Sequence, residues 1–191
     1  MFARYLRPAL SLLVVMTLLL GIAYPLLITA VARIIFPLQA SGSLIYKDGQ
    51  LRGSELIGQA FSEPRYFWGR PSATAPQPYN GIASSGSNLG PLNPALIDQV
   101  RANAQALRDA DPLEPGSIPV DLVTASASGL DPDISVAGAR WQVARVARER
   151  GSTPARVEAL IAERSKGKLL GLVGETRVNV LELNLALDQL H

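Results

Sequence analysis

The chain has 191 residues, enough for one domain of ordinary size with an appendage. Hydrophobic residues make up 48% and charged residues only 18%, below the share of about 25% that is usual for soluble domains. There is no cysteine and one histidine, His191, which excludes thiol chemistry, thiolate metal sites and histidine-rich zinc sites. The net charge is only +2 and no basic face is concentrated along the chain, which argues against nucleic-acid binding.

An uninterrupted apolar segment lies near the start of the chain. Residues 8–32 contain no charged side chain, and about 20 apolar residues suffice to cross the roughly 30 Å hydrocarbon core of a bilayer. Gly21 and Pro25 are tolerated in membrane helices. The segment predicts a single transmembrane helix over about residues 8–32, kinked near Pro25. The alternative, a signal peptide cleaved after Ala30-Val31-Ala32, is disfavoured because the apolar region exceeds the usual length of about 7–15 residues.

Positive charges flank this helix on both sides. Arg4 and Arg7 favour a cytoplasmic N-terminus, whereas Arg33 and Lys47 on the other flank reduce the contrast. We therefore expect the N-terminus in the cytoplasm and the rest of the chain outside the cytoplasmic membrane. One helix cannot enclose a transport pathway, so a transport role requires partner subunits.

The rest of the chain predicts one extramembrane domain of mixed α/β (α+β) class over residues 37–191, after a tail and membrane helix in residues 1–36. Residues 43–52 predict two short strands around an Asp48-Gly49 turn. Residues 69–94 are rich in Gly, Ser and Pro and predict a long irregular loop. A loop of this length in a compact domain is usually functional or ordered by a partner.

Helices and short strands alternate in the second half of the prediction. Three helices are expected where a capping residue precedes apolar periodicity: after Asn93-Pro94, after Ser135 and from Thr153-Pro154. The second of these is expected to continue to Gly151. Short strands are expected at Ile118–Val123 and Leu169–Val173. Residues 178–188 fit either an alternating strand or a helix capped by Asn179, and leucine and alanine favour the helix.

Two polar pairs have a chemical interpretation beside a structural one. Ser165 and Lys168 match the S-x-x-K signature of serine acylases, but the companion motifs are absent, which favours a solvated basic loop. Asp131 and Asp133 have the spacing of cation ligands but lack the later ligands of a calcium loop. A turn that leads into the next helix is the favoured interpretation.

Two further groups have an anion-binding interpretation. Arginines are concentrated in the helix expected after Ser135, at Arg140, Arg145, Arg148 and Arg150. A solvated face with an Arg145–Glu149 pair is favoured over an anion site there. The small residues of Ser84–Leu89 carry backbone N–H groups that can form an anion-binding nest, although a simple turn is favoured.

The residues alone therefore favour a membrane-anchored, non-catalytic module that acts on a partner. A membrane-tethered serine hydrolase outside the cytoplasm is the alternative. It is disfavoured because the sequence offers no internal histidine or cysteine.

Short strings spread along the whole chain carry a family resemblance. They are Arg7–Leu10, Gly21–Leu27, Phe36-Pro37, Gln39–Ile45, Arg52–Ser54, Leu56–Gln59, Tyr66-Phe67, Gly69–Thr74, Ser87–Leu89, Val120–Asp131 and Val178–Leu187. In this order and at this chain length they resemble the C subunit of the Kdp-type potassium-transporting ATPase. The resemblance implies a non-catalytic accessory subunit of a bacterial high-affinity potassium uptake complex in the inner membrane.

The resemblance also implies the partners. A channel-like subunit carries potassium and a P-type ATPase subunit hydrolyses ATP, while the C subunit serves assembly and activity beside the lipid bilayer. The chain lacks a potassium-filter string of the T-V-G-Y-G kind. It also lacks a P-type D-K-T-G motif, so those tasks belong to the partners.

Family members are described as catalytic chaperones that raise the ATP affinity of the ATPase subunit. That role draws on a string likened to the signature motif of ABC transporters. Here it corresponds to Ser84, Ser85, Gly86, Ser87, Asn88 and Leu89, with Ser85 in place of the first glycine. Asp133 stands where many members carry histidine. ATP is thus implied by resemblance only, and no catalytic residue or metal ligand is expected.

Partner contacts are expected in both parts of the chain. The candidate positions are Gly21, Pro25, Trp68, Arg70, Pro71, Ser72, Thr74, Ser126, Ser128, Gly129 and Asp131. The favoured mechanism is an outer domain that braces the channel subunit, with Gly21 permitting close helix packing. The alternatives are direct ATP contact through Ser84–Leu89 and assembly scaffolding without an effect on turnover.

Overall fold

The structure is a computed structural model that describes residues 2–168 and 171–190. The chain divides into an N-terminal unit, up to Leu44, and a second unit from Ile45 onward.

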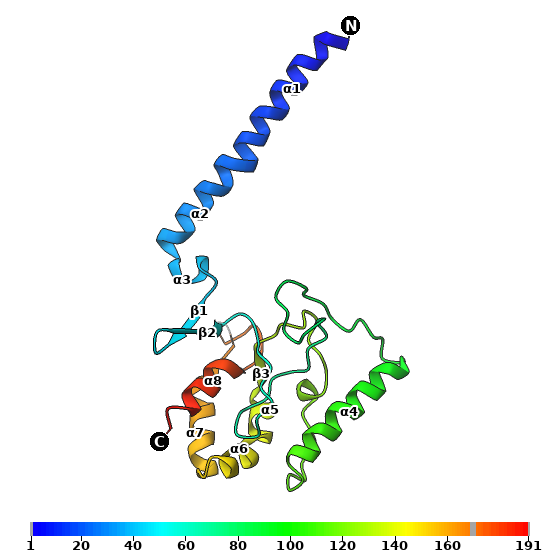
Figure 1. Ribbon diagram of the computed structural model, residues 1–191, viewed down its shortest axis with the longest axis vertical. Coiled ribbons are helices and arrows are strands. Elements are labelled where there is room, and N and C mark those ends of the chain that lie inside the picture. The colour runs from blue at the N-terminus through cyan, green and yellow to red at the C-terminus, as the bar shows by residue number, and fades with distance from the viewer. Residues whose placement is uncertain (1, 169–170, 191) are drawn as a thin grey trace. The chain divides into compact units, whose positions relative to one another are not determined.

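A long exposed helix dominates the N-terminal unit (Figure 1). It consists of α1 (Phe2–Leu18), the π-helical turn η1 (Leu19–Ala23) and α2 (Tyr24–Ile35), which follow one another without a break. Within its 32 residues from Arg4 to Ile35, an 18-residue window has a mean hydropathy of 2.4 and contains no buried residue. A helix of this length extends for roughly 50 Å, more than a bilayer core requires. The predicted transmembrane helix is thereby confirmed as a helix long and apolar enough to span a membrane.

The π-helical turn lies directly before Pro25, where the sequence predicts a kink. The backbone N–H of Tyr24 donates to the carbonyl of Leu19, five residues earlier. Proline has no N–H, and its ring presses on the carbonyl four residues before it. A single widened turn accommodates such a residue while the helix continues.

A short helix, α3 (Pro37–Ala40), ends the N-terminal unit in a Schellman turn. The N–H of Ser43 donates to the Leu38 carbonyl at 2.9 Å, and the N–H of Gly42 donates to the Gln39 carbonyl at 3.0 Å. Gly42 adopts φ +83°, which favours glycine. The turn reverses the chain within a few residues.

The second unit begins with a two-stranded hairpin, as predicted. Strands β1 (Leu44–Lys47) and β2 (Gln50–Ser54) flank a two-residue turn. Asp48 and Gly49 both have positive φ, +54° and +72°, which is the type I′ geometry favoured by Asp-Gly.

The predicted irregular loop is longer than expected and is partly buried. Apart from one isolated bridge, residues 55–93 form no strand or helix. Within this stretch Phe67 has no exposed surface and Thr74 is buried. The loop therefore contributes to the core instead of only covering it.

The next element, α4 (Pro94–Ala110), begins as predicted, with the Asn93 side chain accepting the N–H of Ala95. It lies at one side of the second unit (Figure 1) and buries only Leu107 fully. The strand predicted at Ile118–Val123 is wrong, because Val120–Leu122 form a 3₁₀ turn, η2. Pro119 precedes this turn, and its carbonyl accepts the N–H of Leu122 at 3.1 Å.

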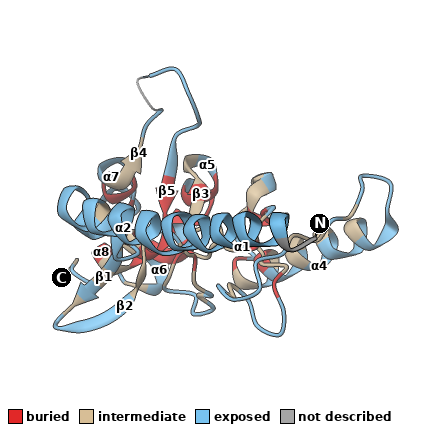
Figure 2. Cartoon of the chain, turned by 90° about the horizontal axis from the view of Figure 1, so that it is seen from above, coloured by how far each residue is buried: buried red, intermediate tan, exposed pale blue. Residues whose placement is uncertain are grey.

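A small antiparallel sheet and four helices complete the unit. The sheet has the order β3-β5-β4, and the helices follow or connect its strands: β3 (Asp133–Ser135), α5 (Val136–Trp141), α6 (Val143–Glu149), α7 (Pro154–Arg164), β4 (Ser165–Lys166), β5 (Arg177–Asn179) and α8 (Val180–Leu187). In register, Val178 faces both Ile134 and Ser165. The buried residues gather around this sheet and its helices (Figure 2).

Three predictions for this region are confirmed and three need correction. Ser135 and Thr153 cap α5 and α7, and Asn179 caps α8, so the helical interpretation of the C-terminal segment is confirmed. The single helix expected up to Gly151 is two helices, because the chain breaks at Gln142. The basic loop expected at Ser165-Lys166 is strand β4. Of the strand expected at 169–173, residues 169 and 170 lie outside the described residues, and residues 171–172 form a turn.

Candidate functional site

The Gly69–Thr74 string and the 125–131 string lie side by side and are joined by hydrogen bonds. Arg70 Nη1 lies 3.0 Å from Asp131 Oδ2, and Arg70 Nη2 donates to the Ala125 carbonyl. The Ser72 hydroxyl donates to the Gly129 carbonyl at 2.7 Å and accepts the N–H of Tyr79 at 2.9 Å. The polar side chains at these candidate positions thus hold one loop against the other.

The Thr74 side chain bonds to residues later in its own loop, residues 70–80. Its hydroxyl donates to the Gln77 carbonyl at 2.7 Å and accepts the N–H of Asn80 at 3.0 Å. Tyr79 donates its phenol to the Arg70 carbonyl at 2.6 Å. Burial raises the pKa of Tyr79 to about 12, so the phenol is a neutral donor at neutral pH.

Ser84–Leu89 packs against the same 125–131 loop. The Ser84 hydroxyl and the Ser85 N–H both lie 3.0 Å from the Ser128 carbonyl. A Cβ on Gly86 would lie 2.6 Å from the Ala127 carbonyl oxygen. The segment forms neither a helix nor the simple turn expected, and the N–H of Ser85 is already bonded to the neighbouring loop.

Gly129 makes the contact between these loops possible. It has φ +67°, and a Cβ there would lie 2.5 Å from the Ser85 carbonyl oxygen and 2.7 Å from Thr74 Cγ2. Only glycine fits at such a distance and backbone angle. We call residues 70–80, 84–89 and 125–131 the loop cluster. It holds all six residues of the nucleotide-motif candidate and most of the extramembrane partner-contact candidates; Trp68 lies just before it, and Gly21 and Pro25 lie in the membrane helix.

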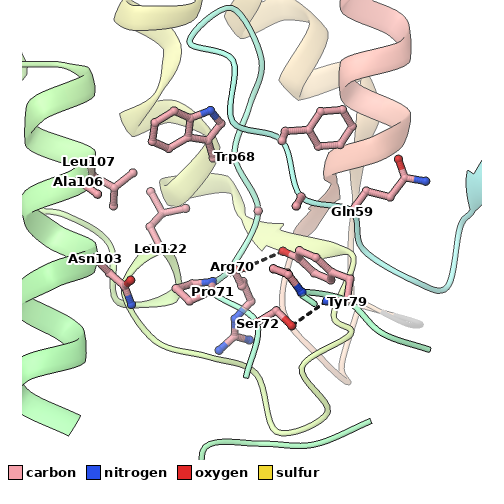
Figure 3. A pocket seen from close by; sticks show the side chains of 14 residues that line it. Gln59, Trp68, Arg70, Pro71, Ser72, Tyr79, Asn103, Ala106, Leu107 and Leu122 are labelled. Atoms are coloured by element: carbon pink, nitrogen blue, oxygen red, sulfur yellow. Dashed lines mark hydrogen bonds between the residues drawn. The ribbon is translucent and has the colours of Figure 1, made fainter. Parts of the chain in front are cut away.

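A groove of about 240 Å³ runs between the loop cluster and α4 (Figure 3). Trp68, Pro71 and Leu122 line it opposite Asn103 and Leu107 of α4, and Arg70, Ser72 and Tyr79 provide polar groups at one end. Asn103 Nδ2 also donates to the Val123 carbonyl at 3.0 Å, which fastens α4 to the chain behind the groove. Trp68 and Pro71, two of the partner-contact candidates, thus line this groove.

The arginine-rich region is not the solvated face that the sequence predicts. Arg145 has no exposed surface, and its guanidinium donates to the carbonyls of Pro64 and Tyr66 and to Gln142 Oε1. It stacks over the Trp68 ring at 4.5 Å. Burial lowers the pKa of Arg145 to about 10. The expected Arg145–Glu149 pair is replaced by these contacts with the irregular loop.

The other arginines of this region are also engaged, except at one position. Arg148 bonds to the fully buried carboxylate of Asp111 at 3.1 Å, which ties α6 to the end of α4. Arg150 bonds to Asp188 at 2.8 Å, while Arg140 is exposed as predicted. These ion pairs connect elements far apart in sequence.

The Asp131–Asp133 pair leads into a strand and not directly into a helix as the sequence favours, because Asp133 begins β3 and α5 starts only at Val136. Asp131 Oδ1 accepts the N–H of Asp133 at 3.0 Å, and Asp133 pairs with Arg177 at 2.7 Å. Burial raises the pKa of Asp133. Within residues 2–168 and 171–190, no group of three or more acidic, histidine or cysteine side chains is arranged to hold a metal ion.

The acylase motif gains no support from its surroundings. The Ser165 hydroxyl donates to the Ile161 carbonyl at 2.6 Å, which ends α7. The neighbouring Lys166 ammonium lies between the carboxylates of Glu55 and Glu182. Ser165 therefore has a structural partner, while Lys168, the lysine of the motif, is exposed.

Sequence reasoning missed two buried amide side chains that bond to the backbone just before the loop cluster. Gln142 and Asn184 have almost no exposed surface and bond to the backbone of Trp68 and Phe67, respectively. The signal that could have revealed them is that each is a polar residue at a position where the apolar helical pattern predicts a buried side chain.

Comparison with known proteins identifies the family to which this arrangement belongs. The family model described as "KdpC: K+-transporting ATPase, c chain" matches residues 6–189. The potassium-transporting ATPase KdpC subunit of Sorangium cellulosum is 63% identical, over 96% of this chain and 97% of the relative. Those of Polaromonas naphthalenivorans and Herpetosiphon aurantiacus are 61% and 56% identical, each over 97% of this chain and over 94% and 96% of the relative.

These matches define a class first: an accessory membrane subunit of an ion-transporting ATPase, with one spanning-type helix and one α+β domain. Within that class, the chain belongs to the KdpC family, the c chains of K⁺-transporting ATPases. The resemblance stated from the sequence is confirmed.

Proposed function

We propose that the chain is the non-catalytic subunit that assembles the channel-like and P-type ATPase subunits of a bacterial potassium pump. One observation carries this proposal: the polar residues of the family strings are used to bond the loop cluster to itself. Ser72, Thr74 and Arg70 each have a partner within the cluster. Such an arrangement supports a rigid binding surface more than a site of chemistry, which needs groups directed at a substrate.

We further propose that the subunit raises the ATP affinity of its partner without touching the nucleotide. A phosphate-binding nest requires consecutive free backbone N–H groups. In the Ser84–Leu89 segment the N–H of Ser85 is bonded to the Ser128 carbonyl, and Gly86 lies against Ala127. This favours the bracing mechanism over direct contact.

The proposed orientation puts the N-terminus in the cytoplasm and the second unit outside the inner membrane. Arg4 and Arg7 before the apolar helix support it. Protease added to right-side-out vesicles is then expected to digest the second unit. Digestion only after lysis of the vesicles would reverse the orientation and end the outer-brace mechanism.

The membrane helix is proposed to pack against a partner helix at Gly21. A Cβ built on Gly21 meets only Thr17 Cγ2 of its own helix, at 3.9 Å, so the glycine leaves a shallow notch. Small residues let membrane helices approach closely. Replacing Gly21 by Leu is expected to reduce recovery of the other subunits in a pull-down. The change Val15→Leu, at another exposed position of the same helix, serves as the control.

The proposal is tested by adding the purified full chain back to a complex that lacks it. The expected result is a lower KM for ATP with potassium-stimulated turnover restored. An unchanged KM with restored assembly would leave a scaffold without a chaperone role. Failure to restore either property would contradict the accessory function itself.

A further inference from the structure

Helix α4 faces two cavities where it meets the rest of the second unit. The groove of about 240 Å³ is lined by Asn103, Ala106 and Leu107 of α4 (Figure 3). A second cavity, of about 160 Å³, is lined by Leu96, Gln99 and again Asn103. Residues three or four apart are neighbours on a helix, so these side chains share one face. A cavity wall has no atoms to pack against and loses that dispersion energy. This face therefore holds α4 only weakly in place.

The N-terminal half of α4 has few other attachments. Val100 is only partly buried, and Leu92, just before the helix, is 93% exposed. Among the residues that the structure describes, a single hydrogen bond joins positions 95–107 to a segment beyond the helix and its cap. It runs from Asn103 Nδ2 to the Val123 carbonyl at 3.0 Å. Elements with few buried apolar contacts move locally at a low cost in free energy.

The C-terminal end of α4 is held firmly by contrast. The Asp111 carboxylate directly after the helix has no exposed surface and pairs with Arg148 of α6 at 3.1 Å. The Arg108 guanidinium donates to the carbonyls of Glu114 and Gly116. A hinge needs a fixed end at which a few residues absorb the change in backbone angles. These contacts provide such an end.

We propose that α4 is a hinged lid on the groove, which pivots at Asp111 and uncovers the wall of Trp68 and Pro71 when its N-terminal half swings away. In the structure the lid is closed, and the hydrogen bond from Asn103 to Val123 keeps it so. Opening breaks this bond and separates few apolar atoms, because the two cavities already lie between the helix and the loop cluster. The lid belongs to the second unit alone and goes beyond the proposed accessory function.

Distances between pairs of spin labels test the pivot, because the chain contains no cysteine of its own. The full chain in mild detergent carries one label at Glu158→Cys, an exposed position of α7, a helix that is anchored in the core. The second label is at Asp98→Cys near the start of α4 or, as the matched control, at Asp109→Cys near its end; both positions are exposed. Double electron–electron resonance gives the distance distribution of each pair. Amide hydrogen exchange of the unlabelled chain reports whether α4 remains helical.

The 98–158 pair is expected to show two distances and the 109–158 pair one, while the amides of residues 98–107 stay protected from exchange. A single narrow distance for both pairs would overturn the proposal. Two distances for both pairs would also overturn it, because the end of α4 would then not be fixed. Exchange of these amides as fast as that of Leu92 would do the same, because α4 would then unfold instead of pivoting.

The role of Asn103 is tested in the 98–158 pair by the change Asn103→Ala. Loss of the hydrogen bond to Val123 is expected to raise the ratio of open to closed chains about fivefold, the equivalent of about 1 kcal/mol. The change Gln105→Ala is the control, because the Gln105 amide bonds to Asp109 of the same helix at 2.7 Å. It is expected to leave the ratio unchanged. Equal ratios in the two variants would contradict the assignment of Asn103 as the residue that keeps the lid closed.

Discussion

The side-chain amide of Asn184 pairs with the backbone of Phe67 as a neighbouring strand would. Its Oδ1 accepts the Phe67 N–H at 2.9 Å and its Nδ2 donates to the Phe67 carbonyl at 3.0 Å. Gln142 does the same for Trp68, at 2.8 and 3.1 Å. Buried backbone groups are costly when unpaired. The two amides therefore allow a loop without regular structure to pass through the core and present the residues that follow it.

Replacing Asn184 by Ala is expected to destabilise the chain by about 2–4 kcal/mol, because two buried backbone groups lose their partners. The measurement is denaturant unfolding of the full chain in mild detergent, followed by the fluorescence of Trp68 and Trp141. The exposed Gln189→Ala change is the control and is expected to have an effect within about 0.5 kcal/mol. Equal midpoints for the two variants would show that the amide pairing is not important.

Replacing Gly129 by Ala is expected to cost more stability than replacing Gly151 by Ala. Both glycines have positive φ, +67° and +61°, so both changes carry backbone strain of about 1–2 kcal/mol. A Cβ at 151 meets nothing within 4 Å, whereas a Cβ at 129 would lie 2.5 Å from the Ser85 carbonyl oxygen.

The difference between the two variants measures the packing of the loop cluster. It is expected to exceed about 1 kcal/mol in the unfolding assay. The Gly129 variant is also expected to recover less of the partner subunits. Similar stability and recovery for both variants would contradict the close packing of Ser85 on Gly129.

Replacing Tyr79 by Phe is expected to remove a tyrosine titration step near pH 12, measured by absorbance at alkaline pH. The pKa of Tyr79 is raised from 10.0 to about 12 mainly by burial. The folded chain thus keeps a proton that the unfolded chain releases, so the hydroxyl's stabilising effect is complete below pH 10 and is lost as pH rises through 12. The exposed Tyr46→Phe variant is the control and should retain the step.

Replacing Ser85 by Gly, which restores the glycine of the family string, is expected to leave the KM for ATP of the complex unchanged. The Ser85 contact to Ser128 is made by the backbone N–H, which glycine also has. A fall in KM would indicate that the serine side chain obstructs a nucleotide and would favour direct contact. Steady-state ATPase assays on the reconstituted complex distinguish the two.

Local signals made much of the fold predictable. The uncharged run of residues 8–32 predicts a membrane-type helix, and Asp48-Gly49 predicts a hairpin, because each pattern determines structure within a few residues. Capping by Asn93, Ser135 and Asn179 is equally local. The strand expected at Ile118–Val123 failed because Pro119 starts a 3₁₀ turn there.

The organisation of the site depended on contacts that sequence spacing does not encode. Arg145 was expected in solvent because arginine is mostly exposed. Instead it is fully buried and donates to the carbonyls of Pro64 and Tyr66, about 80 residues earlier in the chain. Likewise, nothing at Ser84–Leu89 indicates that Ser128 occupies one of its N–H groups. Family strings located the loop cluster, whereas only the structure gives the partner of each polar atom.

Photolabelling of the assembled complex with a radioactive azido-ATP tests the central claim most directly, namely that this subunit changes ATP affinity without binding ATP. The account predicts label on the ATPase subunit alone, in a preparation whose KM for ATP depends on the presence of this chain. Label on this chain within Ser84–Leu89, removed by excess ATP, would contradict it.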